Sequence, residues 1–477
     1  MLEPSSPLTR RVFIPVSVMI VGLFLLLVAV TPAHAIPAFS RKYQTSCATC
    51  HSNFPELNDF GLAFKKNGFK FPKDDESFIK EPPVLLGAKA LREVYPNAIY
   101  PGEIPGNIPI AFRYSGFANY NNTQPVALGF VPRADLFAPN TFTILSAGSF
   151  GEHITWWIDD DLSTGGSGAA GGLGDGYIKV SDVGHYFHLP TNALNVRFGQ
   201  FELDLPFSQA RTINPSGYDI FDQVSVTGPG GLVNNAFAMG QPQRGFEIGG
   251  YPNNGNFWWS LALVDGNNTN AAVRNGKDVY FNTWKQFNLE RDPKARKEVQ
   301  AAGPTGPRDH TSLRLGGFYY GGASTLNEDR VMFVDAPTAR FPFYRVGGDF
   351  RYRYRQFELY GLAMRGHDDN LQINAAQNGY LPMPAVTYTG GFVESEYWIH
   401  PWLIGILRYD MVNSPADFAN GVSEGTTRNR FSPGLQILFR SNIKGVFEFQ
   451  RNWGRPIPGS PFIFHPTGVT LGIDFVM

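Results

Sequence analysis

The chain has 477 residues, of which only 17% are charged and 14% are aromatic, and its formal net charge is -1. Its mean hydropathy of -0.18 is too low for a polytopic helical membrane protein, and the composition also points away from an ordinary soluble enzyme. A net charge close to zero provides no global field that would attract nucleic acid, so we expect no nucleic-acid partner.

Residues 1–35 are typical of an export signal peptide. Arg10 and Arg11 precede an apolar run over residues 12–30, and an A-H-A cleavage sequence ends at Ala35. The run is also long enough for an uncleaved anchor, and the paired arginines resemble a twin-arginine signal. We favour cleavage after Ala35 and the general secretory route, because the membrane barrel inferred below has to cross the inner membrane unfolded.

The only two cysteines of the chain, Cys47 and Cys50, are followed directly by His51 in a C-x-x-C-H motif. This is the attachment pattern of c-type haem, in which two thiols bond to the vinyl groups of the porphyrin and the imidazole ligates the iron. A disulfide or a thioredoxin-like redox pair would use the same cysteines, but neither needs the adjacent histidine. The motif predicts one covalent haem c with His51 as the proximal iron ligand.

The residues around the motif, 36–80, are predicted to form a small α-helical haem segment. Pro55 stands at the first turn of a short expected helix and Gly68 stands near its end. Because so short a segment cannot bury a core of its own, we expect it to lean on the rest of the chain. Its basic residues are either ordinary solvated side chains or groups that dock an acidic partner or face acidic barrel residues. Four apolar residues are predicted to shield the haem: Phe39, Leu57, Phe60 and Phe64.

The second axial ligand of the iron is not supplied by this segment, which contains no other histidine and no methionine. It would have to come from the downstream domain, from the mature amino terminus or from a lysine. Without it, a five-coordinate iron would favour peroxidase-like chemistry. The downstream candidates are His153, His185, His188 and Met239. His185 and His188 are otherwise expected to be surface residues.

The chain changes character after the haem segment. Prolines recur through residues 81–107, which we interpret as a stiff connector. Over residues 108–477, segments of roughly ten residues alternate apolar or aromatic with polar side chains, which is the pattern of a transmembrane β-barrel. No apolar run after residue 35 approaches the length of a membrane helix. A chain of this kind would enter a membrane only as strands.

The clearest alternation runs from Tyr344 to Arg355, with aromatic residues at even positions and mostly charged residues at odd positions. A water-soluble sandwich could show the same period of two, but the export signal and a final alternating strand ending at Met477 favour the membrane barrel. We therefore expect an all-β fold, namely a transmembrane antiparallel β-barrel of about 16 strands preceded by the α-helical haem segment. Tight hairpin turns are expected at residues 253–255 and 441–442.

Three further stretches are interpreted without a binding role. The cluster Asp159 to Asp161 could bind a cation near a rim, but we interpret it as a solvated strand end. The glycine-rich residues 163–176 are expected to form a flexible loop, because they lack the lysine of a phosphate-binding loop. Residues 266–310 are expected to form a long surface loop with some helix.

Beside a C-terminal barrel, the haem motif and its flanking residues give the chain a recognisable pattern. It resembles the fused monohaem cytochrome-porins of the bacterial outer membrane, known from iron-oxidising bacteria. Where that family commonly has alanine and glutamine, this chain has Ser40 and Lys42, which suggests a sister branch. The residues that carry the resemblance are Pro37, Phe39, Arg41, Cys47, Cys50, His51, Pro55 and Leu57.

The resemblance implies electron transfer across the outer membrane. The haem segment would lie in the barrel lumen or at its periplasmic mouth. It would link an extracellular donor or acceptor, of which Fe2+ is one, to a periplasmic cytochrome or another soluble carrier. Two rival hypotheses remain: a passive porin plugged by the haem segment, and a peroxidase-like haem enzyme with an open iron site.

Overall fold

The computed structural model describes most of the chain after the predicted export signal. The described ranges are 38–71, 75–85, 93–96, 103–106, 108–121, 125–126, 129–130, 133–150, 153–164, 172–208, 212–222, 239–240, 242–266, 276–290, 311–326, 339–374, 379–413, 429–453 and 467–477. The predicted signal peptide, Pro37 and parts of the predicted connector lie outside them. Within the described ranges, no helix is both long enough and apolar enough to cross a membrane.

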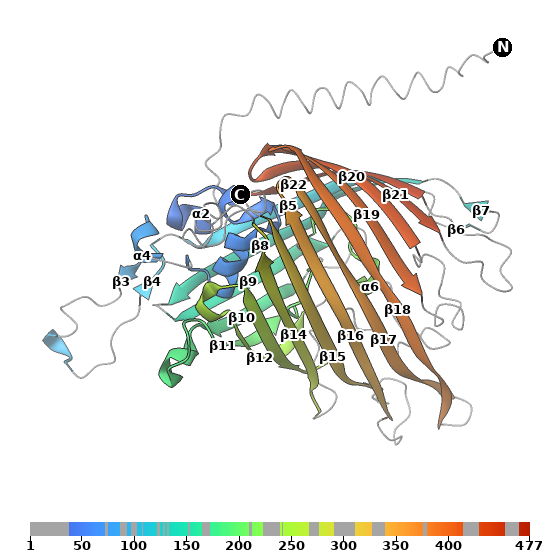
Figure 1. The fold of residues 1–477 in the computed structure, drawn as a ribbon, viewed down its shortest axis with the longest axis horizontal. Helices are drawn as coiled ribbons and strands as arrows, with labels where there is room; N and C mark the ends of the chain where they lie inside the picture. The colour runs from blue at the N-terminus through green and yellow to red at the C-terminus, as the bar shows by residue number, and fades with distance from the viewer. Residues whose placement is uncertain are drawn as a thin grey trace, which may run out of the picture. The chain divides into compact units, whose positions relative to one another are not determined.

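Sixteen antiparallel strands form one closed barrel, as predicted (Figure 1). Strands that follow one another in the barrel pair in sequence order, and the C-terminal strand β22 closes the barrel by pairing with β5. The strands are β5 (Ile110–Asn121), β8 (Arg133–Phe150), β9 (Ile154–Thr164), β10 (Leu173–Val180), β11 (Asn195–Phe201), β12 (Gln243–Gly250), β13 (Phe257–Val264), β14 (Asp278–Asn288), β15 (Ser312–Leu326), β16 (Ala339–Tyr354), β17 (Phe357–Asn374), β18 (Gly379–His400), β19 (Leu403–Asn413), β20 (Asn429–Arg440), β21 (Ile443–Trp453) and β22 (Thr467–Val476).

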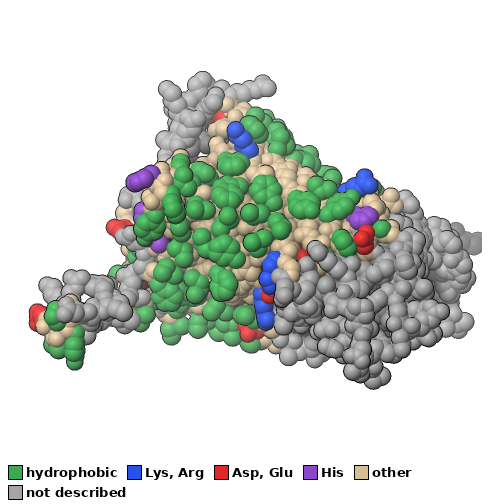
Figure 2. Space-filling view, turned by 90° about the horizontal axis from the view of Figure 1, so that it is seen from below, with side chains coloured by type: hydrophobic (Ala, Val, Ile, Leu, Met, Phe, Trp, Pro, Cys, Tyr) green, Lys and Arg blue, Asp and Glu red, His purple; other side chains and the backbone are tan. Residues whose placement is uncertain are grey.

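The alternation predicted from the sequence sets the two faces of the barrel wall. In β16, Arg351 and Arg353 are buried inside the barrel, whereas Val346 and Tyr354 are 43% and 46% exposed on its outside. Figure 2 shows an outer face on which hydrophobic side chains form a broad patch, with charged side chains at its margins. A wall that is apolar outside and charged inside suits lipid and not water, so the barrel is a membrane barrel.

The elements before the barrel are short. They are α2 (Ala38–Tyr43), η1 (Cys47–Thr49), β1 (His51–Asn53), β2 (Glu56–Leu57), α3 (Asp59–Lys66), α4 (Asp75–Phe78), β3 (Val84–Leu85) and β4 (Glu103–Ile104). The helix expected from Pro55 is wrong at its start, because Glu56 and Leu57 pair with β1 instead. Asn58 caps α3 by accepting a hydrogen bond from the Gly61 backbone N–H, so the helix begins at Asp59.

Residues 202–208 and 212–222, between β11 and β12, fold into the lumen and include α6 (Asp219–Asp222). Phe207 and Tyr218 of this stretch pack with Tyr360 and Phe392, which point inward from the barrel wall. The buried core of the protein therefore lies inside the barrel, between its wall and the segments that enter it.

The connections bear on several predictions. Residues 441–442 form the predicted turn between β20 and β21, and η4 (Pro252–Asn254) links β12 to β13 as a tight connection. The prediction of a loop over residues 266–310 is wrong at Asp278–Asn288, which form β14 because their alternating side chains fit the wall. Asp159 to Asp161 do not form a strand end, because β9 continues to Thr164. The small elements β6 (Pro125–Val126), β7 (Gly129–Phe130) and η2 (Val183–Phe187) complete the fold.

Candidate functional site

Residues 38–71, called here the N-terminal segment, are anchored to the inner side of the barrel wall by buried ion pairs. The guanidinium of Arg353 on β16 donates to the carboxylate of Asp59. Lys66 of α3 donates to Asp204 in the stretch after β11, and its ammonium lies 3.6 Å from the centre of the Trp258 ring. The segment leans on the barrel wall as expected, but contrary to the expectation it also has a small core of its own, in which Tyr43, Phe64 and Phe69 are buried together.

The cysteines lie on one short helical turn inside this segment. The Ser46 hydroxyl caps the turn by accepting from the Ala48 N–H, and the Cys50 N–H donates to the Cys47 carbonyl over 3.1 Å. Residues three apart on such a turn project to the same side. The two thiols are free, with no disulfide between them. Burial raises the pKa of the Cys47 thiol and raises that of Cys50 to about 12, so both stay protonated at neutral pH.

Two residues that the sequence reasoning missed hold this turn in place. The Asn58 N–H donates to the Cys50 carbonyl, and the Asn58 side-chain amide donates to the Thr49 carbonyl. Gly61 of α3 faces the Cys50 carbonyl where any Cβ would overlap the oxygen. The only feature of the sequence that points to Asn58 is the suitability of asparagine as a helix N-cap. Nothing in the sequence points to the contact of Gly61.

His51 is oriented by two backbone carbonyls. Its Nδ1 lies 3.2 Å from the Pro55 oxygen and 3.2 Å from the Glu56 oxygen. Since a carbonyl only accepts, Nδ1 carries the proton, and Nε2 is the ring nitrogen with the lone pair. Iron-ligating histidines are commonly held in this way by their other ring nitrogen.

Cys47, Cys50 and His51 all line one cavity of about 1140 Å³ between the N-terminal segment and the barrel wall. Phe39, Leu57 and Phe64 line it as well. Phe60 does not line it and instead contacts Phe71, one of the lining rings, with their centres 5.0 Å apart. Four of the predicted apolar residues thus gather around the motif, three at the cavity and one behind it.

The cavity lining also contains charged side chains. Asp159, Asp161, Asp175 and Glu202 contribute carboxylates to the lining, and Arg113 pairs with Asp474 over 2.9 Å. Among the described lining residues, His51 is the only histidine and methionine is absent. The lining amines are those of Lys65 and Lys444.

The four downstream candidates for the second axial ligand are not brought to the cavity. His185 and His188 are exposed at η2, and the His153 ring stacks on that of His185 with centres 5.3 Å apart. Met239 is buried in the core cluster around Phe201 and Tyr280. The expectation that His185 and His188 are surface residues is confirmed.

The residues present fit a c-type haem. The thiols share one helical turn, the imidazole next to them is fixed through Nδ1, and all three border a cavity that is large enough for a cofactor. Aromatic and aliphatic side chains occupy the motif side of that cavity, which suits a porphyrin face.

No protein-family model matches the chain, and no curated protein matches it. Solved porin structures are similar to it at low identity. An anion-selective porin from Comamonas acidovorans is 12% identical over 77% of this chain and 98% of that one, with a TM-score of 0.49. The outer membrane channel DcaP of Acinetobacter baumannii is 12% identical over 77% and 96%, with a TM-score of 0.46. OmpF of Salmonella typhi, in complex with daunomycin, is 10% identical over 77% and 97%, with a TM-score of 0.48.

Proposed function

We propose that this protein transfers electrons across the bacterial outer membrane through one covalently attached haem c held in the lumen of a porin-like barrel. One observation carries the proposal: the C-x-x-C-H turn faces a cavity enclosed between the N-terminal segment and the barrel wall. The external partner is an electron donor or acceptor, with Fe2+ as the donor suggested by the resemblance. The internal partner is a periplasmic cytochrome or another soluble carrier.

The haem, when bound, supplies an iron that exchanges single electrons. Cys47 and Cys50 would hold it through thioether bonds, and His51 would ligate the iron through Nε2. Phe39, Leu57 and Phe64 would shield it from water. The Pro55 and Glu56 carbonyls hold the His51 ring in position and favour the Nδ1–H tautomer.

The location of the cavity in the barrel lumen supports a role in electron transfer across the membrane. The barrel wall crosses the lipid, and the lumen is the route by which a donor outside and a carrier inside can both come close to one cofactor. Electron tunnelling falls steeply with distance, so a single haem serves both sides only from such an intermediate position. The N-terminal segment is tied to the wall by buried ion pairs, which would keep that position fixed.

Two observations favour the rival functions. The absence of a second histidine or methionine from the described cavity lining leaves a peroxidase-like reaction open to the iron, with Arg113 and the lining carboxylates nearby. The insertion of residues 38–71, 202–208 and 212–222 into the lumen would equally serve a porin closed by a plug. Both alternative functions use the same residues, and the experiment below distinguishes them from electron transfer.

The deciding experiment uses the full protein in liposomes that contain trapped ferricyanide, with ferrous iron added outside. Stopped-flow absorbance follows the haem and the trapped oxidant together. We expect fast haem reduction followed by reduction of the ferricyanide. The control is the Cys47→Ser/Cys50→Ser double variant, which keeps the barrel but cannot hold haem covalently.

Electron transfer through haem predicts that only the wild-type protein reduces the trapped oxidant. Equal reduction in both proteins would mean that ions pass through the lumen, as in a porin. Haem that is reduced while the trapped ferricyanide stays oxidised would contradict a transmembrane role, and peroxide-dependent turnover would then favour the enzyme.

A further inference from the structure

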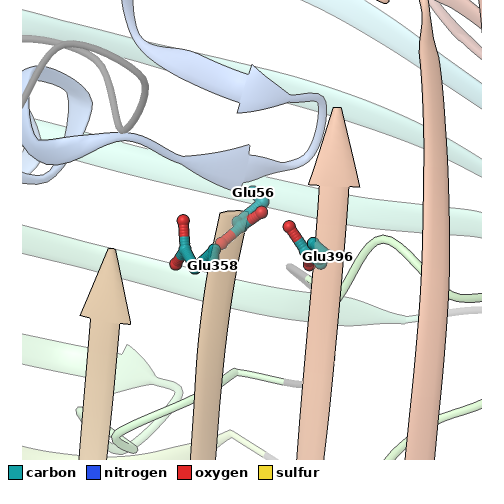
Figure 3. A group of neighbouring side chains, drawn as sticks. All are labelled: Glu56, Glu358 and Glu396. Atoms are coloured by element: carbon teal, nitrogen blue, oxygen red, sulfur yellow. The ribbon is translucent and has the colours of Figure 1, made fainter. Parts of the chain in front are cut away.

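Three buried glutamates meet inside the barrel. Glu56 comes from β2 of the N-terminal segment, Glu358 from β17 and Glu396 from β18, and one carboxylate oxygen of each lies within 4.8 Å of the others (Figure 3). Glu358 and Glu396 are 0% exposed, and Glu56 is 8% exposed. The cluster lies where the N-terminal segment contacts the wall.

Two of these residues are direct neighbours across the sheet. Glu358 and Glu396 pair in register between β17 and β18, and both side chains point into the lumen. Like charges in directly opposed positions destabilise a sheet, and burying an ionised carboxylate without compensation costs far more. An arrangement of this kind needs a compensating positive charge.

The described cations compensate only part of the charge. Arg351 contacts both Glu56 and Glu358, and Arg353 contacts Glu358 and Asp59. These two guanidinium groups pair with three carboxylates, and neither forms an ion pair with the fourth, Glu396. If all of these groups are ionised, the cluster keeps an excess of negative charge that matches one divalent cation.

Two carboxylate oxygens of the cluster accept no hydrogen bond from the described residues. The Tyr360 hydroxyl donates to Oε1 of Glu396 over 2.9 Å, and Arg351 donates to Oε1 of Glu56. Oε2 of Glu56 and Oε2 of Glu396 are buried and have no hydrogen-bond partner among the described residues. Buried polar atoms without partners are uncommon and require an explanation.

Space for a ligand lies next to the cluster. A cavity of about 100 Å³ is lined by Glu56, Arg351 and Tyr360, but by neither Glu358 nor Glu396. Since a water molecule needs about 10–15 Å³ of such cavity volume, it has room for waters that would complete the coordination of a cation held by Glu56. Carboxylate oxygens and water are the ligands of hard divalent cations such as Ca2+, Mg2+ and Mn2+.

We propose that Glu56, Glu358 and Glu396 bind one hard divalent cation, which fastens the N-terminal segment to the barrel wall. The cation balances the excess charge and uses the two unpartnered oxygens. Because the Glu56 carbonyl also accepts from His51 Nδ1, occupancy of this site would stiffen the support of His51. The cation site does not depend on haem, and it stands or falls independently of electron transfer.

The test uses Mn2+ as the probe with the full protein in detergent, after chelator treatment and removal of the chelator. Electron paramagnetic resonance of the free Mn2+ signal gives the bound amount at each total concentration. We expect saturable binding of one Mn2+ per chain. Glu396→Gln and Glu358→Gln each remove one ligand charge with little change of shape, and each should weaken the Mn2+ affinity about tenfold or more.

The matched control is Glu448→Gln. Glu448 is a fully buried lumen glutamate on β21 that lies outside the cluster and accepts from Gln450, so its replacement should change the affinity less than about twofold. Heat-dependent electrophoretic mobility checks that each barrel is folded, and either cluster variant suffices if the other misfolds. Absence of saturable binding to the wild-type protein would overturn the proposal and leave shared protons as the explanation. An equal loss in Glu448→Gln would overturn it as well.

Discussion

Gly61 of α3 packs against the backbone carbonyl of Cys50 so closely that no side chain fits between them. The contact brings the helix and the cysteine turn together, and Asn58 ties the same carbonyl to the first turn of the helix. The position of the Cys50 thiol therefore depends on a residue eleven positions further along the chain.

We predict that Gly61→Ala lowers the amount of covalently bound haem. The added methyl group has to displace either α3 or the Cys50 carbonyl, and overpacking of this kind costs about 1–3 kcal/mol. The measurement is the ratio of haem to protein after denaturation and removal of unbound haem. Gly405→Ala is the control, because the nearest atom to a new Cβ there is 3.7 Å away. Equal haem content in the two variants would contradict a role for the Gly61 contact.

The second prediction concerns the second axial ligand of the proposed haem. No described lining residue of the cavity other than His51 is a histidine, and none is a methionine. A ferrous haem without a strong second ligand binds small neutral molecules, so we expect the reduced protein to bind carbon monoxide, seen as a shift of its main absorbance band. A reduced spectrum that carbon monoxide leaves unchanged would show that another group already ligates the iron.

If carbon monoxide does not bind, Lys65→Ala and Lys444→Ala identify the competing group. These two lysines supply the amines of the described cavity lining. The variant that restores carbon monoxide binding would name the ligand, and the other lysine variant would serve as its control.

The third prediction concerns the attachment of the N-terminal segment to the wall. Arg353→Gln leaves the carboxylates of Asp59 and Glu358 without this guanidinium, and loss of one partner of a buried ion pair costs about 3–5 kcal/mol. We expect the segment to detach part of the time, which would raise the ion conductance of single barrels in planar bilayers. Arg365→Gln on β17 is the control, because Arg365 is exposed. Unchanged conductance in Arg353→Gln would mean that the segment does not obstruct the lumen.

The barrel was predictable from the sequence because the alternation of side chains along a strand is a local pattern. The even and odd residues between Tyr344 and Arg355 must lie on opposite faces of any strand, and in a closed barrel one face meets lipid and the other the lumen. The haem motif is also a local pattern. The spacing of Cys47, Cys50 and His51 is enough to predict covalent haem attachment.

The docking of the segment was not predictable in detail, because it depends on pairs such as Glu56 with Arg351 that are 295 positions apart. A strand pattern shows that Arg351 faces inward, but not what it meets there. The same limit applies to Glu358 and Glu396, which look like ordinary inward-facing residues until Glu56 is placed beside them. The contact of Gly61 was not predicted, because a glycine in a short helix does not indicate which residue packs against it.

The last prediction is a pH dependence that involves Asp204. Burial alone would raise the pKa of Asp204, but the Lys66 ammonium and its hydrogen bond bring that pKa down to about 2. An aspartate in an unfolded chain titrates near about 3.9. Because the pKa is lower in the folded state, the stabilisation by Asp204 is present above about pH 4 and is lost as the pH falls toward about 2.

Pepsin measures this loss, since it cleaves exposed chain in the same pH range. We expect cleavage of the N-terminal segment to rise steeply in the wild-type protein between about pH 4 and pH 2. Asp204→Asn removes the titrating carboxylate but keeps a side chain of the same size. It should be cleaved faster than the wild-type protein at pH 4, and the two rates should converge near pH 2. Parallel pH profiles would show that Asp204 does not contribute to the acid sensitivity.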